Sequence, residues 1–191
     1  MDNATKEDIR KALDVLRRGG VILYPTDTIW GIGCDATNEE AVRRVYAIKR
    51  RDDAKALITL VDSEAKIQGY VREVPDVAWQ LIDCCDHPLT LIYDGARNLA
   101  PNLLAEDGSV AIRLTREAFS KELCLRFKRP IVSTSANLSG DPSPATFDDI
   151  PQAVKDAVDY VCTSRRNDRT PARPSSIIKL AANGEIKIIR E

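Results

Sequence analysis

The sequence predicts an α/β fold in which helices pack on a twisted, largely buried mixed sheet. Segments whose apolar residues follow helical spacing alternate along the chain with short apolar runs typical of strands. Several of these runs are continuously apolar, as in strands covered on both faces. With 191 residues and no internal repeat, the chain is long enough for one well-covered core. We therefore predict a single domain over residues 1–191.

The first part of the chain predicts a helix, a strand and a second helix. Thr5 is a candidate cap for a helix that ends at Gly19-Gly20. "VILYP" then predicts a short buried strand that stops at Pro25. Asn38 is a candidate cap for the second helix, which ends in the basic run "KRR" at 49–51.

The rest of the chain predicts further strands and weaker helices. Asp62-Ser63 is a candidate cap for a third helix, and weaker helices are predicted around 76–84 and 117–127. Asn183-Gly184 is typical of a tight turn between the last two strands. The predicted strands are "ALITLV" (56–61), "TLIY" (90–93), "VAIRL" (110–114), "PIVS" (130–133), "YVC" (160–162), "SSIIKL" (175–180) and "EIKIIR" (185–190).

Composition places the chain among soluble globular proteins. Hydrophobic residues make up 43% of the sequence and charged residues 30%. No apolar run approaches the ~20 residues that span a bilayer, and the charged N-terminus lacks an apolar signal region. We therefore predict a cytoplasmic protein with no membrane partner. The net charge of −1 provides no overall positive field, so a polyanion would have to be bound by a local basic patch.

Cysteine and histidine usage argues against disulfides, a metal site and a catalytic triad. The five cysteines are odd in number and include a vicinal pair, so we predict small core residues rather than disulfides. His87 is the only histidine, and it precedes a strand in a position typical of a turn. Asp27 and Asp35 are the only carboxylates that stand out at strand ends, and each is also a candidate turn cap.

Small polar side chains gather where predicted strands begin or end. "PIVSTSANLSGDPSPAT" (130–146) opens as a buried strand and continues into a row of hydroxyls and an amide. "YPTDTIWGIG" follows the first strand, and Ser175-Ser176 begins a later one. Ligand sites of open α/β sheets form at strand ends. The sequence therefore predicts a pocket for a polar small molecule.

Basic residues suggest how an anion could be held. Lys49, Arg50, Arg51 and Lys55 lie where a helix ends. They either complement the helix dipole or clamp a phosphate group. A second basic run, "SRRNDRTPAR" (164–173), is either a solvated loop or a lid over an anion.

Arg113 stands inside the apolar strand "VAIRL". A buried arginine is costly without an anion. It therefore indicates either an intramolecular salt bridge or a carboxylate ligand that is bound bidentately.

Taken in order, six segments resemble the YrdC/Sua5 family, and they cover nearly the whole chain. Each motif is weak alone, but their common order and spacing make the resemblance strong. The segments are "GGVILYPTDTIWGIGCDA", "IKRRDDAKAL", "HPLTLIY", "SVAIRL", "STSANLSGDPSPAT" and "RPSSIIKL", with "IIR" matching the closing segment of the family.

The resemblance implies a short, single-domain threonylcarbamoyl-AMP synthase with a YrdC-like fold. Such an enzyme forms threonylcarbamoyl-AMP and pyrophosphate from L-threonine, bicarbonate or CO2, and ATP, for the t6A modification of tRNA. It implies Mg2+ held mainly by the ATP phosphates, no protein metal site, and tRNA-threonylcarbamoyl transferase proteins as partners. Family positions imply threonine contacts at Thr26, Arg113, Ser133 and Ser175, catalytic roles for Lys49 and Arg51, and nucleotide contacts at Lys49, Arg51, Lys55, Ser109, Ser135, Asn137, Ser143 and Arg190.

Some positions depart from the family pattern, and other functions stay open. Trp30 replaces a tyrosine or phenylalanine, Ala56 a proline and His87 a glycine, and Leu60 stands where some members carry a histidine. One alternative is a YciO-like chain that binds nucleotide or RNA without this activity. A second is a double-stranded-RNA-binding module, although only 5% of residues are aromatic and could stack on bases. A third is a regulatory protein that binds nucleotide without turnover.

Overall fold

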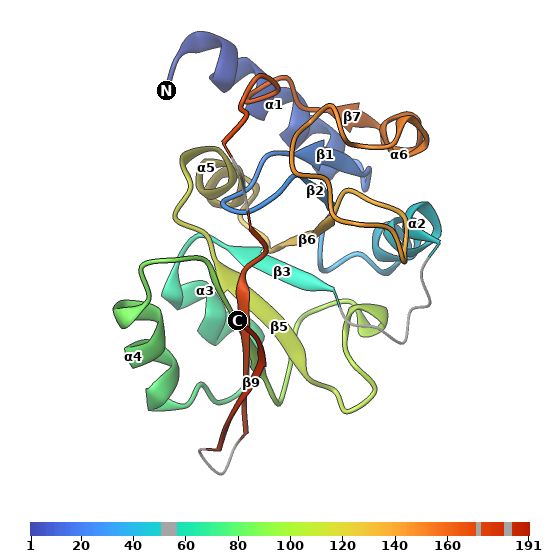
Figure 1. Ribbon diagram of the computed structural model, residues 1–191. Coiled ribbons are helices and arrows are strands. Elements are labelled where there is room, and N and C mark those ends of the chain that lie inside the picture. The colour runs from blue at the N-terminus through green and yellow to red at the C-terminus, as the bar shows by residue number, and fades with distance from the viewer. Residues whose placement is uncertain (51–56, 171–172, 182–184) are drawn as a thin grey trace.

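The computed structural model describes residues 1–50, 57–170, 173–181 and 185–191. In these residues a mixed sheet has the strand order β7-β1-β2-β6-β3-β5-β4-β8-β9 (Figure 1). β1 to β6 are largely buried, so the predicted fold class is confirmed. The strands are β1 (Ile22–Tyr24), β2 (Gly31–Gly33), β3 (Ile58–Val61), β4 (Leu89–Tyr93), β5 (Val110–Leu114), β6 (Ile131–Ser135), β7 (Tyr160–Val161), β8 (Ser176–Leu180) and β9 (Ile186–Arg190).

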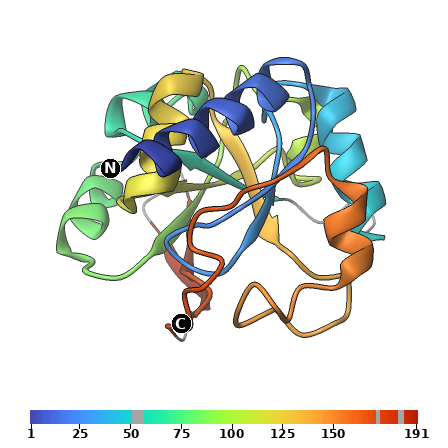
Figure 2. The same cartoon turned by 90° about the horizontal axis from the view of Figure 1, so that it is seen from above.

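Helices α1, α3 and α5 lie on one side of the sheet (Figure 2), where α5 and α3 pack against β3 and α1 packs against α5. α2 packs against α6 and against a short 3-10 helix, η1. None of the helices in the described parts of the chain is long and apolar enough to cross a membrane. The helices are α1 (Asn3–Arg17), α2 (Glu39–Lys49), α3 (Glu64–Tyr70), α4 (Asp76–Cys84), η1 (Pro101–Leu103), α5 (Ala118–Phe127) and α6 (Gln152–Ala157).

Two of the predicted helix caps differ in outcome. Asn38 caps α2 as expected, because its side-chain oxygen accepts a hydrogen bond from the backbone N–H of Ala41 at 3.1 Å. The prediction for α1 is wrong: the helix begins three residues earlier, at Asn3. Asp2 is its cap and accepts from the backbone N–H of Thr5 at 2.7 Å. A carboxylate at the cap also complements the positive end of the helix dipole.

β2 is a strand that the sequence pattern does not predict. Its residues Gly31, Ile32 and Gly33 pair antiparallel with β1 on one side and with β6 on the other. Glycine is uncommon in strand interiors unless another group approaches closely. Here the ring of Tyr24 provides that approach, since a Cβ built on Gly33 would lie 2.5 Å from Tyr24 Cε1.

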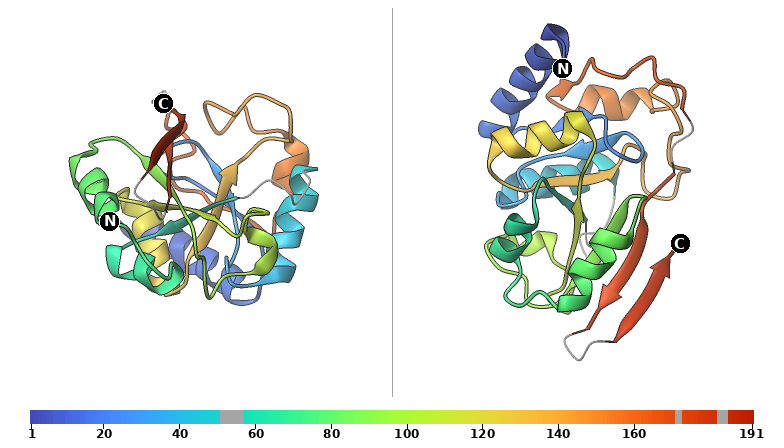
Figure 3. Two further views of the ribbon diagram at one scale, coloured as in Figure 1. Left: turned by 90° about the horizontal axis from the view of Figure 1, so that it is seen from below. Right: turned by 90° about the vertical axis from the view of Figure 1, so that its left-hand side faces the viewer.

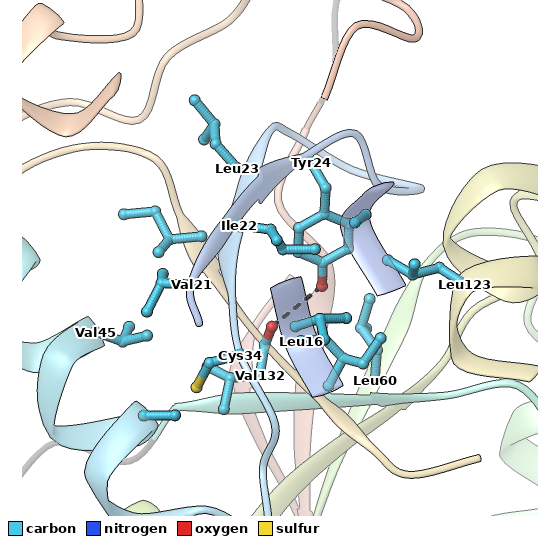
Figure 4. Packing of buried hydrophobic residues seen from close by; sticks show 14 of the residues in the cluster. Leu16, Val21, Ile22, Leu23, Tyr24, Cys34, Val45, Leu60, Leu123 and Val132 are labelled. Carbon is cyan, nitrogen blue, oxygen red and sulfur yellow. Dashed lines mark hydrogen bonds between the residues drawn. The ribbon is translucent and has the colours of Figure 1, made fainter. Parts of the chain in front are cut away.

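Tyr24 lies at the centre of the larger of two hydrophobic clusters (Figure 4). Its ring is fully buried, and its hydroxyl donates to the carbonyl oxygen of Val132 at 3.2 Å. Cys34, Cys124 and Cys162 are also buried, and burial raises the pKa of each thiol. All five cysteines are free, and the three buried ones lie in the core as predicted, whereas Cys84 is exposed and Cys85 is half-buried.

The hairpin of β8 and β9 extends from the end of the molecule opposite to α1 (Figure 3). β9 is an edge strand whose residues are all exposed, and Ile188 is 61% exposed. β8 and β9 pair antiparallel as predicted. The predicted turn at Asn183-Gly184 lies outside the described residues.

Candidate functional site

A cavity of about 200 Å³ opens where several strands begin or end. The loop between β1 and β2, the ends of β5 and β6, and the start of β8 contribute to it. With the start of β3 and the end of β9, it brings together six segments that lie far apart in the sequence. The lining residues are Thr28, Ile29, Trp30, Gly31, Leu57, Ile58, Arg113, Ser133, Thr134, Ser135, Ser143, Pro174, Ser175, Ile177 and Arg190.

β6 supplies the serines at the floor of the cavity. Ser133 and Ser135 alternate with Thr134 along the strand, so their side chains share one face of the sheet. Ser135 is opposite Gly31 in the register with β2. A Cβ on Gly31 would lie 3.2 Å from Ser133 Oγ, so the glycine leaves the serine hydroxyls open to the cavity.

Arg113 is the dominant charge in the cavity, and it is only 3% exposed. Its NH2 nitrogen lies 3.0 Å from Asp27 Oδ1 and donates to Thr28 Oγ1 at 3.3 Å. The ion pair is not a well-aligned hydrogen bond, because both Asp27 Oδ1 and Arg113 Nε are buried without a hydrogen-bond partner. The predicted salt bridge is therefore present but does not satisfy the guanidinium, which retains N–H groups for an anion.

Asp27 is mostly buried against Arg113. Burial raises the pKa of its carboxyl above the ordinary value, and the positive charge of Arg113 opposes the rise. Because the native pKa exceeds the unfolded one, the native state retains a proton that the unfolded chain releases as the pH rises from about 4. This contribution to stability is complete below the unfolded pKa and is lost as the pH rises through the native pKa.

We predict that Asp27→Asn removes this pH dependence. The difference in unfolding free energy, wild type minus Asp27→Asn, should fall as the pH rises from about 4 and then level off. Urea unfolding of both chains at a series of pH values measures it. A difference that grows with pH would show that the attraction of Arg113 lowers the pKa of Asp27 by more than burial raises it.

Thr28, rather than Thr26, lines the cavity. Thr26 is buried below the loop, where its hydroxyl donates to the carbonyl of Ile29 at 2.7 Å. Its oxygen also accepts from the backbone N–H of Thr28 at 3.1 Å and contacts Thr28 Oγ1 at 3.1 Å. Thr26 therefore shapes the loop and orients Thr28 toward Arg113.

Ser175 and Arg190 also line the cavity. Ser175 Oγ lies 2.7 Å from Thr90 Oγ1, and Thr90 pairs directly with Arg113 between β4 and β5. Arg190 donates through Nε and NH2 to the carbonyl of Ser175 at 2.9 and 2.7 Å. Burial and then the positive charge of Arg113 lower the pKa of Arg190. Two arginines that repel each other across one cavity favour a negatively charged ligand.

The remaining predicted nucleotide contacts are dispersed. Ser135 and Ser143 line the cavity, whereas Lys49, Asn137 and Ser109 do not. Ser109 precedes β5 by one residue and lies about 13 Å along the strand from Arg113, at ~3.3 Å per residue. Arg51 and Lys55, and the departure at Ala56, lie outside the described residues.

Three other residues that the sequence singled out do not line the cavity: His87, Leu60 and Arg165. His87 lies outside the cavity with its side chain 57% exposed, near Ser176 Oγ at 3.2 Å. Leu60 is fully buried in the core. In the second basic run, Arg165 donates to the Thr26 carbonyl at 2.9 Å and pairs with Asp168. These contacts hold the loop that carries Arg165 against the segment that carries Thr26 and Thr28.

Trp30 forms an apolar wall of the cavity. Its ring centroid lies 4.8 Å from that of Phe147, which follows Ser143 in the loop after β6. Cations of Lys155 and Arg166 lie 4.6 and 4.9 Å from the Phe147 ring. The aromatic pair therefore joins the two loops that carry Thr28 and Ser143.

Comparison with known proteins agrees with this geometry. The Sua5/YciO/YrdC family model, described as "Telomere recombination", matches residues 14–191. The chain belongs to this family. Its sequence is 33% identical over 181 residues to the threonylcarbamoyl-AMP synthase of Pseudoalteromonas translucida, covering 93% of this chain and 95% of the relative.

Solved structures of the family share the fold. Sua5 of P. abyssi, crystallised with L-threonine, superposes with a TM-score of 0.79 at 27% identity, over 90% of this chain and 50% of that one. This chain thus spans about half the length of that Sua5. YciO of E. coli has a TM-score of 0.84 at 23% identity, over 97% of this chain and 89% of that one, which shows the fold alone. The predicted family is confirmed, and the names of the relatives favour the synthase over the YciO-like alternative.

Proposed function

We propose that this chain is a threonylcarbamoyl-AMP synthase whose cavity binds L-threonine. The observation that carries this proposal is Arg113, a buried guanidinium whose Nε has no hydrogen-bond partner and which lies beside a set of hydroxyls. A carboxylate bound there would fill the missing hydrogen bonds bidentately. Thr28, Ser133 and Ser175 would accept and donate around the amine and hydroxyl of the substrate.

The chemistry needs little acid–base catalysis from side chains. The threonine amine attacks CO2 and loses a proton to give a carbamate. A carbamate oxygen then attacks the α-phosphorus of ATP in line, and pyrophosphate leaves. The chain contributes by holding the carbamate and the nucleotide together, an effect worth up to ~7–11 kcal/mol. Cationic groups stabilise the charge on the phosphates.

The nucleotide would extend from the cavity along the loop after β6. Ser135, Ser143 and Arg190 line the cavity, and Ser109 would contact the far end of the nucleotide. We assign phosphate contacts to Arg51 and Lys55 from the family resemblance. No cluster of three or more histidine, cysteine or acidic residues in the described parts of the chain could hold a metal ion. Mg2+ would therefore arrive on the ATP phosphates, whose oxygens are its preferred ligands.

The wider role follows from the same reaction. The product would supply the threonylcarbamoyl group for t6A in tRNA, through partner transferase proteins in the cytoplasm. Direct binding of tRNA or other double-stranded RNA remains an alternative activity. Its affinity would fall steeply as salt rises, because phosphate contacts release counterions.

Pyrophosphate release by the purified chain tests the proposal. With ATP, bicarbonate and Mg2+, L-threonine should stimulate release, whereas L-serine should stimulate it weakly because it lacks the methyl group that would pack against the apolar wall. ATP binding without release would support a regulatory nucleotide-binding protein instead.

A further inference from the structure

Lys49 is the last residue of α2, and its ammonium group points into the protein rather than into the cavity. The residue is 2% exposed. Its Nζ donates to the carbonyl oxygens of Ser135 at 2.6 Å and Asn137 at 2.8 Å, and it lies 3.2 Å from Asn137 Oδ1. The ammonium thus donates to acceptors on Ser135, at the end of β6, and on Asn137, in the loop that follows.

Backbone contacts join the same two segments. The N–H of Ser139 donates to the Lys49 carbonyl at 2.8 Å, so the loop is bound to both the side chain and the main chain of this residue. Asn137 Nδ2 donates in turn to the carbonyl of Asp141 at 2.6 Å. The loop between β6 and Gly140 is therefore built around the C-terminal end of α2.

The Lys49 ammonium supplies hydrogen-bond donors to backbone carbonyl groups at and just after the end of β6. The carbonyl groups of Ser135 and Asn137 point into the protein, and buried carbonyl groups are costly without a donor. The ammonium satisfies both, and the negative end of the α2 dipole favours its charge. To contact a phosphate at hydrogen-bonding distance, Nζ would have to leave these acceptors and orphan them.

We propose that Lys49 is a positioning residue that holds the backbone of residues 135–139 in the shape that binds nucleotide, without contacting a phosphate itself. This inference rests on the proposed function and refines it. The lysine acts through Ser135 and Asn137, whose side chains are the predicted nucleotide contacts. Its ammonium group is hydrogen-bonded to the loop before any ligand binds.

The variant Lys49→Met tests this role because it retains the length of the side chain and removes the donors. We expect the unliganded variant to unfold at a lower urea concentration and its KM for ATP to rise about 10- to 100-fold, the cost of misplacing a binding group by about 1 Å. The KM for threonine should change by less than about threefold, because Arg113 does not contact this loop.

Lys66→Met is the matched control. Lys66 is a partly buried lysine whose Nζ pairs with Asp62 and donates to the Cys124 carbonyl at 2.9 Å, and it does not line the cavity. This variant should also lose stability, but its KM for ATP should stay within about threefold of the wild-type value. Equal rises in KM in the two variants would reduce the role of Lys49 to general stability and overturn the proposal.

A measurement on the wild-type chain remains decisive even if Lys49→Met does not fold. Acetic anhydride labelling, followed by peptide mass analysis, should leave Lys49 unmodified both without and with a non-hydrolysable ATP analogue. Exposed Lys11 should be labelled in both samples. Labelling of Lys49 that the analogue suppresses would place its ammonium on a phosphate and overturn the proposal. If instead the chain releases no pyrophosphate but Lys49 stays protected, the proposed function fails while the structural role stands.

Discussion

Replacing Arg113 with alanine should remove nearly all threonine-dependent pyrophosphate release. The guanidinium is buried, and its hydrogen bond and ion pair within the described residues are with Thr28 and Asp27, both through NH2. Truncating one partner of a buried, hydrogen-bonded charge pair costs ~2–5 kcal/mol. At about 1.4 kcal/mol per factor of ten, kcat/KM for threonine should fall about 30- to 4,000-fold.

A matched arginine separates this effect from loss of folding. Arg116 follows Arg113 by three residues and donates to the carbonyls of Ile82 and Cys85 at 2.8 and 3.2 Å, outside the cavity. Arg116→Ala should retain activity to within about threefold. Arg113→Lys should recover only part of the activity, because an ammonium lacks the planar fork that binds a carboxylate bidentately. Unchanged threonine dependence in Arg113→Ala would move the substrate carboxylate elsewhere, with Arg190 as the nearest cation.

Arg113 also shows what a sequence can predict about such a site. A charged residue inside an apolar strand conflicts with its local pattern, and such conflicts indicate a functional or strained position. The same argument found Ser133 and Ser135, which follow a buried strand without a turn to explain them. Strand-end clustering then predicted that these residues would meet, and all three line the same cavity.

Side-chain direction could not be predicted in the same way. Thr26 and Thr28 are chemically identical and two residues apart, yet Thr26 is engaged by hydrogen bonds within the loop while Thr28 lines the cavity. Lys49 lies in a basic run that resembles a phosphate clamp, yet its ammonium is directed at carbonyls by the end of β6. The direction of Lys49 depends on contacts across 86 to 88 residues of sequence, which no local pattern contains.

The sequence did not predict β2 because glycine has a low strand propensity. Substitution of one of these glycines, Gly33, should have the largest effect on stability. In Gly33→Ala the new Cβ would lie 2.5 Å from Tyr24 Cε1, 2.8 Å from the Val132 carbonyl oxygen and 3.2 Å from Ile131 Cγ2. The second contact is with backbone, so a side-chain rotation cannot relieve it. Overpacking of this kind costs ~1–3 kcal/mol or more, and we expect the upper end of that range.

Gly69→Ala is the matched control, because the same substitution at this site should stabilise the protein rather than destabilise it. Gly69 lies in α3, where an added Cβ would meet nothing within 4 Å. Alanine should therefore stabilise that helix by ~0.5–1 kcal/mol, because glycine loses more conformational freedom on folding. Urea unfolding of both variants measures the two effects. If Gly33→Ala were as stable as the wild type, β2 and β6 could separate slightly at no cost. The cavity floor, which depends on the close approach of Gly31 to Ser133, would then be adjustable rather than fixed.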